Sequence, residues 1–134
     1  VDLKTMTNDA DLAWFYYGIN KYQPNTNHID YIKANNTKFK FVAIASTWDA
    51  SSKKLLPEFY KVMILASVPE ENILAYAADQ SQQTGTDADR TYKFKKAPTF
   101  LLLKDGKEIG RIAAESNEPL ETAFANLILK ANDK

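Results

Sequence analysis

Phe39–Pro57, with the sequence FKFVAIASTWDASSKKLLP, is the stretch that decides the fold. From Phe41 to Ala45 every residue is apolar, which is typical of a strand that is covered on both faces. Trp48–Ser52 then indicates a sharp turn, after which apolar residues recur at helical spacing. The stretch therefore predicts a buried strand, a turn and a helix, with Pro57 inside the helix and removing one backbone donor.

Three further strands complete the predicted sheet. The apolar run from Ile73 favours a strand parallel to the first one, joined to it by a right-handed crossover. Asp105-Gly106 is a strong hairpin signal between two more strands, which we expect to be antiparallel. We predict strands at residues 39–46, 73–79, 99–104 and 107–113, with the first strand lying between the second and the third.

Helices are expected before and after this sheet. Leu12, Phe15, Tyr16 and Ile19 follow a helical pattern that Gly18 interrupts. A second helix over 26–34 should face Ile29 and Ile32 inward. A last helix is expected to begin at Ser116 or Asn117, with Pro119 in its first turn. We predict a helical extension over residues 1–36, packed on a domain that spans residues 37–134 as a single globular unit.

Composition excludes several classes of function. The 134-residue chain has 17 basic and 17 acidic residues, whereas nucleic-acid binders normally carry a basic excess. No apolar run approaches the roughly 18 residues that a membrane span needs. Cysteine is absent, so thiol chemistry, disulfides and thiolate metal sites are excluded. We expect no metal and no cofactor. Because the sequence starts at Val1, we expect a mature protein from which a signal peptide has been removed.

The order of these motifs resembles the thioredoxin family. The strand that ends in Ser46-Thr47-Trp48 and leads into a helix with an internal proline is similar to the family's active-site region. Lys95–Phe100 looks like its cis-proline loop, and Leu101–Ile112 looks like its closing hairpin. The resemblance covers residues 39–130. It implies an α/β thioredoxin-like fold, with a four-stranded mixed sheet, helices on both faces and a cis bond between Ala97 and Pro98.

One subgroup looks closest. Tyr22-Gln23-Pro24 and Trp48–Ser52 are similar to segments of bacterial monothiol thioredoxin-like proteins, which carry W-C-G-D-S and are periplasmic or secreted. Aligning Trp48 places Asp49 at the position of the nucleophilic cysteine and Ser52 at that of the resolving cysteine. Ala43 stands where redox-active members keep a buried acid. The resemblance thus implies a relative of redox-homeostasis proteins that is itself redox-inactive.

Three interpretations of function remain open. In the leading one, a protein or peptide binds the remnant groove, which the resemblance assigns to Trp48, Asp49, Ala50, Ser51, Ala97, Pro98 and Thr99. In the second, the natural protein is a thiol-disulfide oxidoreductase whose Cys at position 49 was replaced by Asp. In the third, a partner docks on the aromatic N-terminal helix through Trp14 and Tyr17. The simpler interpretation of Asp49, which we favour, is a plain helix N-cap.

Other polar residues are interpreted more simply. The single histidine, His28, is expected on the surface. Asp79, Asp87 and Asp89 flank a polar loop and could supply oxygen ligands for Ca²⁺, but they lack the spacing of a calcium-binding loop. We therefore expect a solvated loop there.

Overall fold

The computed structural model describes residues 13–46, 50–78, 85, 92, 94, 96–113, 116 and 118–132. Two helices, α2 (Ala13–Lys21) and α3 (Thr26–Ala34), precede the first strand, β1 (Lys40–Ala45). Helix α4 (Ala50–Leu65) and a 3₁₀ turn (Glu70–Asn72) lead to β2 (Ile73–Ala77). The hairpin of β3 (Thr99–Lys104) and β4 (Lys107–Ile112) is followed by α6 (Leu120–Asn132).

The sheet has the predicted topology. Its strand order is β2-β1-β3-β4, with β1 parallel to β2 and antiparallel to β3, and β3 antiparallel to β4. Asp105 and Gly106 both have positive φ, at 52° and 80°, as a two-residue hairpin turn of the primed type requires. The four-stranded mixed sheet is therefore confirmed, and its order and directions are those expected of a thioredoxin-like fold.

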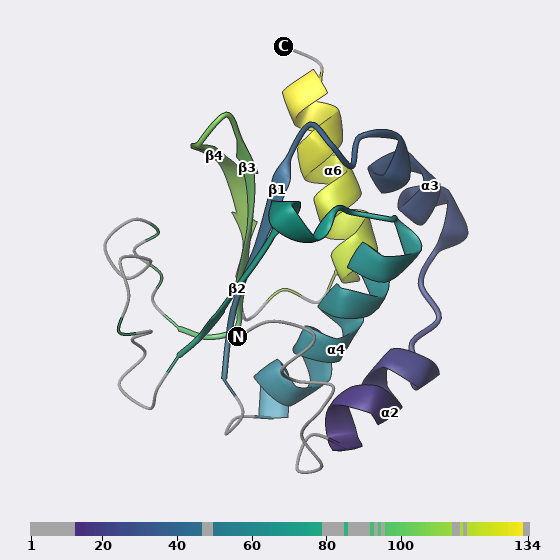
Figure 1. The fold of residues 1–134 in the computed structure, drawn as a ribbon, viewed down its shortest axis with the longest axis vertical. Helices are drawn as coiled ribbons and strands as arrows, with labels where there is room; N and C mark the ends of the chain where they lie inside the picture. The colour runs from purple at the N-terminus through teal and green to yellow at the C-terminus, as the bar shows by residue number, and fades with distance from the viewer. Residues whose placement is uncertain are drawn as a thin grey trace.

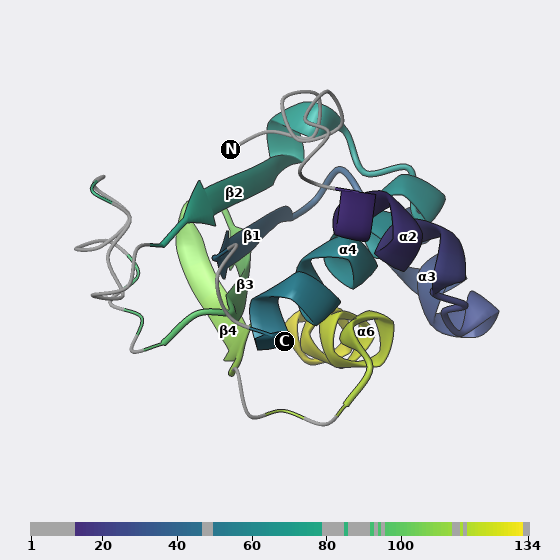
Figure 2. The same ribbon diagram turned by 90° about the horizontal axis from the view of Figure 1, so that it is seen from below.

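The four described α-helices lie on one face of the sheet (Figure 1, Figure 2). A helix on the other face, which the resemblance implies, is not among the elements that the described residues form. Alternate residues of β1 point toward the four helices, beginning with Phe41, whose ring meets that of Phe124 edge-on at 5.3 Å. Phe59 of α4 stacks on Phe100 of β3 at 5.4 Å. All four rings are fully buried, and burying each such side chain stabilises the fold by about 1.5–3 kcal/mol. The aromatic centre of the core thus fixes α4 and α6 against the sheet.

Tyr92 packs against the other face of the sheet. Its ring lies 5.9 Å from that of Tyr76 on β2, and it belongs to a cluster with Val42, Ile44 and Leu101. Burial and the neighbouring Tyr76 raise the pKa of Tyr92 to about 12.

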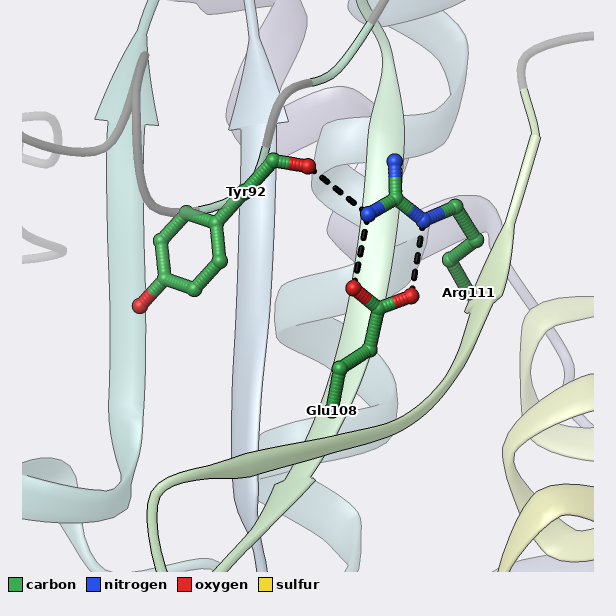
Figure 3. A network of polar contacts seen from close by, with 3 residues as sticks. All are labelled: Tyr92, Glu108 and Arg111. Carbon is green, nitrogen blue, oxygen red and sulfur yellow. Dashed lines mark hydrogen bonds and ion pairs between the residues drawn. The ribbon is translucent and has the colours of Figure 1, made fainter.

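A β-bulge brings two charged side chains of β4 together beside Tyr92 (Figure 3). Residues three apart on a regular strand point to opposite faces, but the register shifts between Leu102 and Leu103. Glu108 and Arg111 therefore meet, with guanidinium-to-carboxylate distances of 2.7 and 2.8 Å. Arg111 also donates to the main-chain oxygen of Tyr92 at 2.7 Å. The fork of Arg111 thus anchors Tyr92 to the edge strand.

The N-terminal helices pack on α4 and α6. Ile29 and Ile32 of α3 are buried as predicted. Gly18 of α2 lies against Pro57 of α4 so closely that an added Cβ would stand 2.6 Å from the Cβ of Pro57. Gly18, which interrupts the helical sequence pattern, thus allows α2 to pack closely on α4 because it has no side chain. None of the helices in the described residues is long and apolar enough to cross a membrane.

Two expectations are corrected. The last helix begins at Leu120, not at Ser116 or Asn117, and Pro119 precedes its first turn, with its carbonyl accepting from the N–H of Ala123 at 2.9 Å. The hydroxyl of Ser116 instead accepts from the N–H of Glu118 in a local turn, at 3.3 Å. His28 is half-buried rather than a surface residue, because its Nδ1 lies 2.8 Å from Oγ1 of Thr122 on α6.

Candidate functional site

The start of α4 and the start of β3 lie at the same end of the sheet. Ile44, near the carboxyl end of β1, pairs with Thr99, the first residue of β3. Helix α4 begins at Ala50, five residues beyond the last residue of β1. The described parts of the two predicted groove segments therefore lie at the same end of the sheet, and the groove between them stays a prediction.

The segment before β3 is tightly held. The peptide bond between Ala97 and Pro98 is cis, and Ala97, Pro98 and Thr99 are all buried. The hydroxyl of Thr99 donates to the main-chain oxygen of Lys96 at 2.6 Å. This local bond fixes the path of the chain as it enters the sheet.

The first turn of α4 presents small side chains. Ala50 and Ser51 are exposed, whereas Ser52 is fully buried beneath the helix. Trp48 and Asp49 lie outside the described residues, so their predicted place beside Pro98 stays a prediction. Of the predicted site, the structure describes Ala50, Ser51, Ser52 and the segment from Ala97 to Thr99.

A hollow of about 360 Å³ opens beside Ser51. Its wall continues along α4 through Lys54, Leu55 and Glu58. The opposite side is formed by Tyr22 and by the chain between β4 and α6, with Ser116, Glu118 and Pro119. Of the predicted site residues that the structure describes, Ser51 alone lines this hollow.

A second hollow, of about 490 Å³, follows between α2 and α4. Three residues line both hollows: Tyr22, Lys54 and Glu58. The remaining lining residues are Tyr17, Gly18, Lys21 and Gln23 from the N-terminal side and Lys53 from α4. We call the two hollows together the α2–α4 groove.

Glu121 holds Tyr22, one of the residues that line both hollows. Only 3% of its surface is exposed, yet its carboxylate has two donors. One oxygen accepts the hydroxyl of Tyr22, and the other accepts the N–H of Asn25 at 2.9 Å. Asn25 in turn caps α3 by accepting the N–H of His28 at 3.2 Å. The carboxylate of α6 therefore joins the end of α2 to the start of α3.

Two groups in the groove titrate abnormally. Burial raises the pKa of Glu58, the charge of Lys54 opposes this effect, and the charge of Glu121 adds to it. Burial and the hydrogen bond to Glu121 raise the pKa of Tyr22 far above its ordinary value. Tyr22 therefore stays a neutral hydrogen-bond donor. The charge state of Glu58 depends on its burial and on the charges of Lys54 and Glu121.

The residues that line or support the groove could not all be predicted from the sequence. Tyr22 stands out in the sequence because Tyr22-Gln23-Pro24 resembles a Tyr-x-Pro segment of related proteins. Glu58 and Glu121, by contrast, look like ordinary acidic residues on a helix surface. Only the packing of α6 against the α2–α3 connection reveals that Glu121 is buried. Among the described residues no group of three His, Asp or Glu gathers that could hold a metal ion, and Asp79, Asp87 and Asp89 lie outside those residues.

No protein-family model matches the chain, and no curated protein matches it significantly. Solved structures similar to it include thioredoxins. The thioredoxin of Fasciola hepatica is 24% identical, with 74% of this chain and 86% of that chain covered and a TM-score of 0.48. The Malassezia sympodialis thioredoxin is 21% identical over 66% and 74% of the two chains, with a TM-score of 0.48. Mitochondrial thioredoxin 3 of Saccharomyces cerevisiae is 20% identical over 81% and 94%, with a TM-score of 0.46.

Proposed function

We propose that this chain is a thioredoxin-like binding domain without redox activity, which holds an extended segment of a protein partner beside the first turns of α4. The chain contains no cysteine, so it cannot form a mixed disulfide with a substrate. Binding at this position must then depend on shape and on non-covalent contacts.

The observation that carries the proposal is the continuity of the α2–α4 groove with the start of α4. Ser51 lines the first hollow, and the second hollow follows along α2. Each hollow falls within the range of about 300–1,000 Å³ that is typical of ligand sites. A peptide that enters beside Ser51 would find side-chain hydroxyls and the amide of Gln23 as polar partners and the stem of Leu55 as an apolar one.

Disulfide tethering tests the proposal without a known partner. Asp49→Cys gives the protein a single thiol, which is offered a library of short peptides that each contain one cysteine, under increasing reductant. The matched control is Thr26→Cys, because Thr26 is an exposed residue in the first turn of α3. We expect the thiol at 49 to retain a small set of related peptides at reductant levels that release every peptide from the thiol at 26.

A further variant separates groove binding from chance reactivity. Ser51→Trp, added to Asp49→Cys, should fill the first hollow and remove the selection while the fold, checked by circular dichroism, is kept. The proposal is wrong if the thiols at 49 and 26 retain the same peptides equally well, or if Ser51→Trp leaves the selection unchanged.

A further inference from the structure

The second hollow of the α2–α4 groove carries an excess of positive charge. Lys21 extends from α2, and Lys53 and Lys54 extend from the first two turns of α4. Glu58 is the one acidic residue among those that line this hollow. Its raised pKa reflects burial, against the attraction of Lys54. The hollow is thus basic in a chain whose overall net charge is zero.

Neither Lys21 nor Lys53 forms an ion pair with a carboxylate of the residues that the structure describes. Within the described part of the chain, the structure records an ion pair between Arg111 and Glu108 but none for Lys21 or Lys53. Lys21 instead places its ammonium 5.6 Å from the ring centre of Tyr17. Tyr17 is 66% exposed, so the ring and the ammonium together form an open rim that is both basic and aromatic.

We propose that the second hollow selects an acidic segment of the partner, with carboxylates directed to Lys21, Lys53 and Lys54 and an apolar side chain beside Tyr17. Charge complementarity favours this occupant, because anionic groups gain from the lysines whereas a basic segment would be repelled. Tyr17 and Tyr22 supply the ring surface that interfaces favour. This inference rests on the proposed function, since it names the class of segment that the groove takes.

The test measures binding of two short peptides to the full chain by fluorescence anisotropy. One peptide carries glutamates around a central leucine, and the other has glutamine in place of each glutamate. We expect the acidic peptide to bind more tightly, and its affinity to fall as salt increases. Replacing Lys21, Lys53 and Lys54 by Gln should weaken its binding about tenfold, since exposed charge pairs contribute modestly but add up.

The matched control replaces three exposed lysines outside the groove, Lys33, Lys38 and Lys107, by Gln. It makes the same change in net charge and should leave affinity within about twofold. Equal binding of the two peptides, equal losses in the two triple variants, or tighter binding of a single-stranded oligonucleotide than of the acidic peptide would overturn the inference. If tethering at position 49 still selects peptides but without preference for acidic ones, the groove binds peptides and only the charge selection is wrong.

Discussion

Tyr22 donates a hydrogen bond to Glu121, although the two residues stand 99 positions apart in the sequence. The same carboxylate accepts the N–H of Asn25, so one side chain of α6 closes the connection between α2 and α3. Tyr22 also lines both hollows of the α2–α4 groove. The shape of the groove therefore depends on the buried carboxylate of Glu121, which does not itself line the groove.

Removing this carboxylate should weaken the fold. Glu121→Ala removes the acceptor of two part-buried hydrogen bonds, from the hydroxyl of Tyr22 and the N–H of Asn25, and a hydrogen bond to a charged group contributes about 1.5–3 kcal/mol. We expect the free energy of unfolding in urea to fall by about 2–4 kcal/mol. Glu118→Ala is the control, because Glu118 is exposed and such changes usually stay within about 0.5 kcal/mol. Equal effects of the two substitutions would contradict the role given to Glu121.

Glu58 should make stability fall as pH rises. Burial raises the pKa of Glu58 in the folded protein, whereas the pKa of a glutamate in the unfolded chain is about 4.3. Above that pH the unfolded chain releases the proton more readily, so stability declines until pH passes the folded pKa. Glu58→Gln carries no proton to lose. The variant should match the wild type in acid and become the more stable protein toward neutral pH.

The measurement is urea unfolding of the wild type and of Glu58→Gln from acid to neutral pH, with Glu118→Gln as the control. A stability difference between wild type and Glu58→Gln that does not change with pH would show that the carboxyl of Glu58 titrates normally.

The contact between Gly18 and Pro57 should reverse the usual effect of alanine. In an exposed helix, Gly→Ala stabilises by about 1 kcal/mol. At position 18 the new Cβ would stand 2.6 and 2.8 Å from two carbons of the Pro57 ring, which cannot rotate away. We expect Gly18→Ala to lower the free energy of unfolding by about 1–3 kcal/mol. Asn20→Ala, at an exposed position of the same helix, should be neutral or slightly stabilising. A stabilised Gly18→Ala variant would show that α2 does not pack this closely on α4.

Arg111 should stabilise the position of Tyr92 more than it stabilises the fold as a whole. Its ion pair with Glu108 is exposed, and such pairs contribute about 0.2–1 kcal/mol. Arg111→Ala also removes the donor to the main-chain oxygen of Tyr92. We expect a small loss of global stability but faster amide hydrogen exchange in the peptide that contains Tyr92. Glu108→Gln, which keeps the donor of Arg111, should change this exchange less. The same exchange rate in both variants would refute the anchoring role.

Much of the fold could be predicted because its signals are local. The apolar run from Phe41 to Ala45 indicated a central strand, and Asp105-Gly106 indicated the hairpin; the structure confirms both. The start of α6 was placed too early because Ser116 is a good capping residue in isolation, whereas its hydroxyl is used in a local turn. A capping residue alone does not decide which of several neighbouring positions begins a helix.

The site could be predicted only in part, because its lining comes from segments far apart in the chain. Ser51, which the resemblance assigns to the site, lines a hollow, and its binding role stays a prediction. The role of Gly18 could not be inferred, because a glycine in a helical pattern carries no sign of the residue that it faces. The burial of Glu121 follows from the packing of α6 against the α2–α3 connection, which periodicity does not specify.

Amide chemical shifts of the full chain, titrated with a peptide selected at position 49 but lacking its cysteine, would test the central claim most directly. Binding in the groove should shift the amides of Ser51, Lys54, Glu58 and Tyr22 together and leave α6 residues such as Leu129 unchanged. If the shifts instead gather on residues remote from the start of α4, or no amide shifts at all, the groove is not a peptide site.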